Sequence, residues 1–187
     1  MSPEEKKTIL NNIINDPGIS KAINELDFKT AYSILSNKRY YWIPILTESL
    51  LDLGIDPAKY LKNIPNHYLQ ESYIKTYSVP NNVMIIEEAA FAYCSELESV
   101  FIPNSVYNIE KFAFHECMLL RRVTLEDRRD NHMLISSHVF HNCFSLDRIV
   151  YEGTIGSFKE NVVFIRKGNE SIKEVVCSDG IISFTES

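Results

Sequence analysis

Hydrophobic residues recur at fixed distances between residues 79 and 149, with polar positions between them. The first full copy of the pattern carries an aromatic residue, a thiol, a leucine and a β-branched residue, at Phe91, Cys94, Leu97 and Val100. Equivalent residues return 23 positions later, at Phe114, Cys117, Leu120 and Val123, and after 26 more, at Phe140, Cys143, Leu146 and Ile149. Self-similarity at this period indicates a solenoid, in which each repeat forms one rung and stacks on its neighbours.

Weaker copies extend the pattern at both ends. Residues 74 and 77 are apolar and lie 23 positions before the Leu and Val of the first full copy, so they predict a truncated first rung. At the other end, Ile172, Val175 and Cys177 each lie 26 positions after Leu146, Ile149 and Tyr151, so Ile172–Cys177 predicts a last rung. Ser178-Asp179-Gly180 then predicts a tight turn into a closing hairpin strand over 181–184.

The first third of the chain shows helical spacing instead. Ser2, Pro3 and Glu5 form a capping box with proline at the first helical position, and the helix they start should end near Asp16-Pro17. Further short helices are predicted over 19–26, 28–35, 45–53 and from residue 57 to about 62. We therefore expect an α+β chain: a helical domain over 1–66 that caps a solenoid over 67–187.

Tyr40, Tyr41 and Trp42 are the largest apolar group of the helical third. We expect these rings to lie in its core or to pack against the repeats, because large aromatic side chains dominate core packing. A surface for a ligand or a partner is the alternative.

The repeats resemble a known family. In the stretch 102–123, an Ile-Pro, a Val, an Ile, an Ala-Phe, a Cys and a final Val stand where the BspA-type leucine-rich repeats carry them. This resemblance implies a short right-handed solenoid with a parallel sheet along one face, and mainly binding roles, since family members are adhesins, surface antigens and interaction modules. The third full copy departs from the pattern, because Glu126 replaces the Pro and three extra residues fall within about 127–134.

Charge and composition limit the classes of partner that this chain can bind. The formal net charge is −6. Residues 1–70 hold eight basic and eight acidic residues, so the excess of acidic residues lies in 71–187. Neither part has the basic footprint that nucleic acid requires. The start lacks the pattern of a signal peptide, and no run approaches the roughly 18 apolar residues of a membrane span. We therefore expect a cytoplasmic location, with the four cysteines as free thiols.

The cysteines and histidines are the residues that suggest chemistry. Because the repeat places Cys94, Cys117 and Cys143 in one inward column, we interpret them as core; a zinc cluster is the alternative, but no spacing matches a zinc site. His115 and His141 should stack on neighbouring rungs at the solvated surface. A small metal-dependent enzyme built on these histidines stays open, although no nucleophile motif accompanies them. We predict no cofactor.

Outward positions of the sheet give the candidate binding site. Strand side chains alternate, so the residues that flank each inward Val or Ile face out. They form two columns, with Ser99, Arg122 and Arg148 in one and Phe101, Thr124 and Val150 in the other. Arginine and aromatic residues are enriched where proteins bind. Arg128, Arg129 and His132 of the inserted loop are a second candidate contact, and solvated arginines on an unused sheet are the alternative.

The sequence thus predicts a non-catalytic, intracellular module that binds another protein, expected to be a host protein. The stretch 50–57 followed by Ile64-Pro65 resembles the helical lead-in of some phage proteins of this family. This resemblance implies a phage or prophage factor that inhibits a host defence protein, such as a CRISPR effector. A cell-surface adhesin or antigen is the alternative from a different class.

Overall fold

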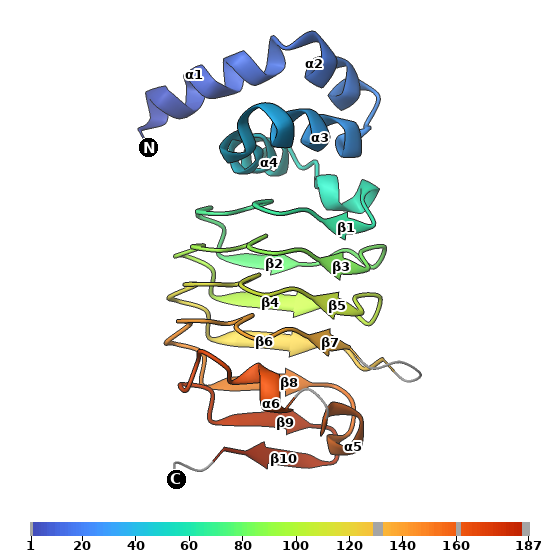
Figure 1. Cartoon of the computed structure of the whole chain (residues 1–187), viewed down its shortest axis with the longest axis vertical. Coiled ribbons are helices and arrows are strands. Elements are labelled where there is room, and N and C mark those ends of the chain that lie inside the picture. The colour runs from blue at the N-terminus through green and yellow to red at the C-terminus, as the bar shows by residue number, and fades with distance from the viewer. Residues whose placement is uncertain (1, 129–132, 160–161, 185–187) are drawn as a thin grey trace.

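A helical region lies at one end of an elongated molecule, and the solenoid extends from it toward the C-terminus (Figure 1). The computed structural model describes residues 2–128, 133–159 and 162–184. The helical region contains α1 (Pro3–Ile14), α2 (Pro17–Asn24), α3 (Phe28–Arg39), the 3₁₀ helix η1 (Tyr40–Trp42), α4 (Ile43–Asp52) and the 3₁₀ helix η2 (Pro57–Tyr60). The expected order of helical region and parallel-sheet solenoid is confirmed.

Polar side chains set where these helices begin. The capping box of α1 is present, with the Ser2 hydroxyl accepting from the Glu5 backbone N–H and the Glu5 carboxylate accepting from the Ser2 N–H. α2 begins at Pro17, two residues earlier than predicted, because the Asp16 carboxylate accepts from the N–H groups of residues 18 and 19. α3 is capped by Asp27 as expected but continues to Arg39, so the predicted loop before α4 is mostly helical.

Two parallel sheets run along the solenoid. The wide sheet contains β2 (Thr76–Ser78), β4 (Ser99–Ile102), β6 (Arg122–Leu125), β8 (Arg148–Tyr151), β9 (Glu174–Cys177) and the antiparallel β10 (Gly180–Ser183). The narrow sheet contains β1 (Asn63–Ile64), β3 (Ile85–Ile86), β5 (Asn108–Ile109) and β7 (Leu134–Ile135). The predicted spacings hold, since Val100 pairs with Val123 and Val123 with Ile149. The closing hairpin is also as predicted.

Both ends of the solenoid carry features that the repeat pattern does not contain. β1 adds a strand to the narrow sheet before the first rung identified from the sequence, with Ile64 beside Ile86. In the last rung, α5 (Ile155–Phe158) and α6 (Val162–Ile165) lie between β8 and β9, where earlier rungs have a strand of the narrow sheet. Terminal repeats are commonly atypical because they have a neighbour on one side alone.

Aromatic rings stack through the middle of the solenoid. The ring centroids of Phe91 and Phe114 are 5.0 Å apart, and those of Phe114 and Phe140 are 5.5 Å apart, in stacked geometry. All three side chains are buried. Tyr68 extends this column into the helical region, because its ring meets Phe91 on one side and Tyr32 of α3 on the other. The helical region and the rungs therefore share one continuous core.

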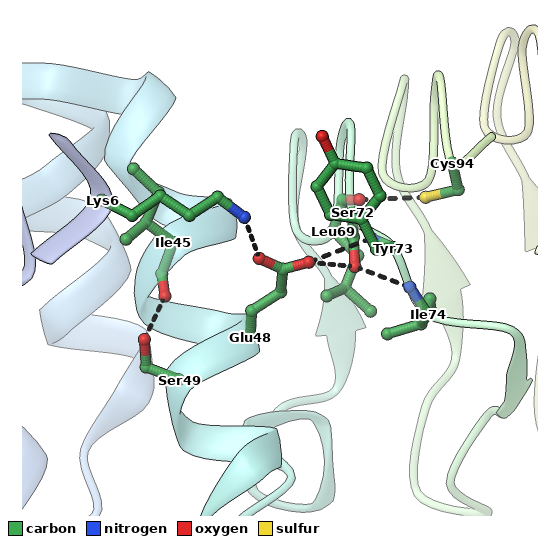
Figure 2. A network of polar contacts seen from close by, with 9 residues as sticks. All are labelled: Lys6, Ile45, Glu48, Ser49, Leu69, Ser72, Tyr73, Ile74 and Cys94. Carbon is green, nitrogen blue, oxygen red and sulfur yellow. Dashed lines mark hydrogen bonds and ion pairs between the residues drawn. The ribbon is translucent and has the colours of Figure 1, made fainter. Parts of the chain in front are cut away.

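A network centred on Glu48 joins α4 to α1 and to the first rung (Figure 2). The Glu48 carboxylate accepts from the Lys6 ammonium at 2.9 Å, from the Ser72 hydroxyl at 2.8 Å and from the Tyr73 backbone N–H at 3.0 Å. Burial alone would raise the pKa of Glu48, but these three donors outweigh it and hold the pKa below its usual 4.5. The junction therefore stabilises the charged form of the Glu48 carboxylate.

Replacing Glu48 with Gln should make the free energy of unfolding depend less on pH in the acidic range. The folded-state pKa is depressed, so the charged Glu48 contributes stability above its ordinary pKa of 4.5 and loses that contribution as the pH falls through the folded-state value. Urea unfolding at a series of pH values should show wild type more stable than E48Q at pH 7, by on the order of 1–2 kcal/mol, with the gap closing below about pH 4.5. E98Q, which removes an exposed carboxylate away from this junction, is the control. A gap that stays constant down to pH 3 would contradict this account.

Candidate functional site

The outward side chains of the wide sheet form two continuous columns. The strand register places Thr76 beside Ser99, Ser99 beside Arg122, and Arg148 beside Glu174. Val123 lies beside Ile149, so Arg148 follows Arg122 in this first column. In the second column, the register runs through Ser78, Phe101, Thr124, Val150 and Val176. The six residues that the sequence assigned to the face are therefore brought together.

The two arginines of the face differ in their surroundings. Both side chains are exposed. The Arg148 Nε lies 2.5 Å from a carboxylate oxygen of Glu174 on the next rung, so its charge is paired within the chain. Among the described residues, the Arg122 guanidinium has no hydrogen-bond or ion-pair partner, and Ser99 is its neighbour on the preceding rung.

Beside the arginines runs a strip of half-buried side chains. Phe101, Thr124, Val150 and Val176 lie on consecutive rungs and are each partly exposed. Ile181 of β10 lies beside Val176 and is 54% exposed, so the strip reaches the last strand. Partly exposed apolar side chains in one row give a face that can bury surface against a partner without rearranging the sheet.

Of the three loop residues predicted as a contact, Arg128 is the one that the structure describes. The Arg128 guanidinium donates to the backbone carbonyls of Asn104, at 2.6 Å, and Ser105, at 2.9 Å. It also lies over the Tyr107 ring, at 5.9 Å from the ring centroid. Arg128 thus fastens the start of the loop to the preceding rung. Arg129 and His132 lie outside the described residues.

A family profile decides which repeat this is. The profile described as BspA type leucine rich repeat region matches residues 58–187, with six copies. The chain belongs to the BspA-type leucine-rich-repeat family. The repeats of such a protein form a scaffold suited to protein binding.

Comparison with solved structures finds a match to a bacterial leucine-rich protein. The crystal structure of a leucine-rich cell surface protein from Faecalibacterium prausnitzii A2-165 is 20% identical in sequence, with a TM-score of 0.36. The match covers 58% of this chain and 33% of that one, so it spans about a third of the other protein. No curated protein matches the sequence. No helix in the described part of the chain is long and apolar enough to cross a membrane.

The BspA-type cysteines are part of the core. Cys94, Cys117 and Cys143 are fully buried, and each thiol donates to a backbone carbonyl, at 2.9, 3.2 and 2.9 Å in that order. Burial raises the pKa of the Cys117 thiol well above its ordinary value. The Cys117 thiol therefore stays protonated and unreactive. Ser72 and Asn169, also buried, lie beyond the two ends of this column and bond to Glu48 and to the Cys143 carbonyl.

The histidines of the BspA-type turns are less exposed than the sequence suggested. The Nδ1 atoms of His115 and His141 are 3.1 Å apart, and the His115 side chain is 16% exposed. His138 contacts His141, at 5.6 Å between ring centroids, and a Cβ at Gly168 would lie 2.4 Å from the His141 ring. These rings pack against each other and against the last rung, so the prediction of solvated histidines is wrong. Among the described residues, no group of three His, Cys, Asp or Glu side chains is placed to hold a metal ion.

Two aromatic residues of the helical region, expected in the core or against the repeats, lie at the surface. Trp42 packs against the core, as expected. Tyr40 and Tyr41, however, are 53% and 46% exposed. They belong to η1, a single 3₁₀ turn in which three consecutive aromatic residues cannot all face inward. The turn buries Trp42 most deeply and leaves the two tyrosines at the surface.

Proposed function

We propose that this chain is a non-catalytic module that binds another protein through the outward face of its wide sheet. The observation that carries the proposal is an exposed Arg122, without a partner in the described part of the chain, beside the strip of Phe101, Thr124 and Val150. An exposed arginine next to partly exposed apolar side chains is the composition that energetically important interface positions favour. The face is built on the paired strands of one sheet, so binding would require little ordering of the chain.

The chemistry of the face indicates the partner's surface. A carboxylate placed over Arg122 would form the bidentate pair that a guanidinium favours. Apolar side chains beside that carboxylate would cover the strip. We therefore propose a protein partner that presents an Asp or Glu next to a small apolar patch.

We further propose that this partner is a host protein inside the bacterial cell, and that the chain is a phage or prophage factor that inhibits a defence protein such as a CRISPR effector. The support is the helical lead-in around 50–57, together with four buried cysteines that are free. Free thiols suit a reducing compartment. A cell-surface adhesin is the competing function. Isolation of the native protein from the membrane or culture-medium fraction would favour the adhesin.

The test is affinity capture from bacterial lysate with two variants that carry the same change of charge. R122E reverses the cation of the face, whereas R121E reverses an exposed arginine that lies one residue before the strand. We expect R122E to bind the captured partner at least about 30-fold more weakly, because it removes a charged contact and adds a repulsion. R121E should retain wild-type affinity. Equal affinity of both variants for every captured partner would exclude the face.

A further inference from the structure

A hollow of about 630 Å³ lies between helix α3 and the first strands of the narrow sheet. Its α3 side is formed by four residues on one face of the helix, Lys29, Tyr32, Ser33 and Ser36. Its other side is the segment 60–65, from the end of η2 through β1, with Glu87 directly after β3. Small-molecule sites in proteins have volumes of about 300–1,000 Å³. The hollow, which we call the α3 hollow, therefore has the size of a small-molecule site.

Two lysines make the α3 hollow positively charged. Lys29 comes from α3 and Lys62 from the segment before β1, and both side chains are exposed. Within the described part of the chain, neither ammonium has a hydrogen-bond or ion-pair partner. Asp27 is influenced by the Lys29 charge but accepts its hydrogen bond from the Thr30 N–H, at 3.1 Å. In a chain of formal net charge −6, this concentration of cations attracts an anion.

Glu87 is the carboxylate in the wall of the hollow. Its two oxygens accept from the Asn63 side-chain amide at 3.2 Å and from the Asn66 backbone N–H at 3.3 Å. A carboxylate offers about four lone-pair sites, so about two acceptor positions remain. Hydroxyl groups of a ligand are neutral donors that suit these positions. The hollow therefore combines cations for an anionic group with an acceptor for hydroxyls.

An exposed aromatic ring completes the hollow. The Tyr60 side chain is 53% exposed. Phe28 contacts its ring in tilted geometry, at 5.4 Å between centroids, and thereby supports it from the core. Tyr32 and Leu61, at 3% and 8% exposed, connect the hollow to the same core. A supported tyrosine ring that is open to solvent is a platform on which a nucleobase stacks.

We propose that the α3 hollow binds a nucleoside monophosphate. The phosphate pairs with Lys29 and Lys62, the ribose hydroxyls donate to Glu87, and the base stacks on Tyr60. A phosphate fits two lysines better than a carboxylate does, because it carries close to two negative charges at neutral pH and three strong acceptor oxygens. Lysine is also a common phosphate-binding residue. The Ser33 and Ser36 hydroxyls supply further donors on the α3 side.

The two sides of the hollow come from different regions of the molecule. α3 belongs to the helical region, whereas β1 and β3 belong to the solenoid (Figure 1). A nucleotide bound between them contacts both regions in the folded chain alone, so it should raise the unfolding temperature. The α3 hollow shares no residue with the outward face of the wide sheet, so its test is independent of the proposed function.

The test is calorimetric titration of the whole chain with AMP and with UMP at physiological salt. Adenosine and uridine lack the phosphate, and ribose 5-phosphate lacks the base. We expect AMP, UMP or both to bind wild type, and each of the three truncated probes to bind at least about tenfold more weakly. The unfolding temperature should rise with the nucleotide and stay constant with the nucleoside.

Two lysine pairs test the phosphate contact. K29Q/K62Q should bind the nucleotide at least about tenfold more weakly, because two charge-assisted contacts are lost. K7Q/K75Q makes the same change in net charge at other exposed lysines and should stay within about twofold of wild type. Both pairs change exposed side chains, so both variants should fold, as thermal unfolding without ligand would verify.

Tyr60 variants test the stacking contact. Y60A should bind about fivefold more weakly, whereas Y60F keeps the ring and should bind as wild type does. Y93A removes an exposed tyrosine outside the hollow and should have no effect.

Four results would overturn the proposal: no binding of either nucleotide, nucleosides that bind as tightly as nucleotides, equal weakening by the two lysine pairs, or tighter binding of the acidic peptide acetyl-Gly-Glu-Glu-Gly-Glu-Glu-Gly-amide. The last result would make the hollow a site for an acidic protein segment. Because the lysine pairs and the probes decide independently of Tyr60, the test holds even where Y60A does not fold.

Discussion

Phe114→Ala lowers the free energy of unfolding by about 3–5 kcal/mol, the range for removing a buried phenylalanine side chain. Phe114 lies in the middle of the aromatic column, with Phe91 stacked at 5.0 Å on one side and Phe140 at 5.5 Å on the other. Alanine would leave a cavity that neither neighbouring ring can fill, because each is held by its own rung. Urea unfolding followed by circular dichroism measures the loss.

Phe144→Ala is the matched control for this prediction. It removes the same side chain from the same family of repeats, but at a position that is 60% exposed. A surface substitution of this kind should change stability by no more than about 0.5 kcal/mol. If Phe114→Ala proved no more destabilising than Phe144→Ala, the aromatic column would not be the core of the solenoid.

Asp56→Ala should cost about 2–5 kcal/mol, because it leaves two buried tyrosine hydroxyls without their acceptor. Asp56 caps η2. Its carboxylate also accepts from the Tyr68 hydroxyl at 2.8 Å and from the Tyr77 hydroxyl at 3.1 Å. Tyr68 is fully buried and Tyr77 is 8% exposed, so water cannot readily replace the lost acceptor. This cluster connects the helical region to the first rung.

The variant Asp56→Asn tests whether the hydrogen-bond acceptor or the negative charge of Asp56 provides the stability. Asparagine keeps one carbonyl oxygen and caps helices about as well as aspartate, so it should retain most of the stability that alanine loses. Tyr77→Phe should lose less than Asp56→Ala, because it removes one hydroxyl and leaves Tyr68 paired. Thermal unfolding of Asp56→Ala, Asp56→Asn and Tyr77→Phe measures which variant loses the most stability. Equal losses for Asn and Ala would show that the charge matters more than the hydrogen bonds.

The repeat region could be predicted closely because its pattern is repetitive. A residue such as Cys117 has counterparts at fixed distances on both sides, and stacking forces all of them into the same environment. The repeat pattern was less informative for the terminal rungs, because each of them has a neighbouring rung on one side alone. Ser72 occupies the position next to the cysteine column at the first rung and bonds to Glu48 of α4, a partner that no periodicity could indicate.

Candidate site residues were harder to judge from the sequence. The alternation of strand side chains placed Arg122 and Arg148 on one face. It could not show that Glu174 pairs with Arg148, or that Arg122 has no partner among the described residues. Likewise, the repeat pattern placed His115 and His141 outside the inward columns, yet the rings of neighbouring turns pack together and exclude much of the solvent.

The sequence by itself determined the period of the solenoid, the inward columns and the caps of the first helices, because each depends on local spacing and on hydrogen bonds between near neighbours. Tertiary structure alone decided which charges are paired, which residues line the α3 hollow, and how Glu48 joins the two regions. These features need residues that are far apart in the chain to meet at a single point. Their distances in space are set by how the helical region packs on the first rung, and the spacing of residues along the chain carries no record of that packing.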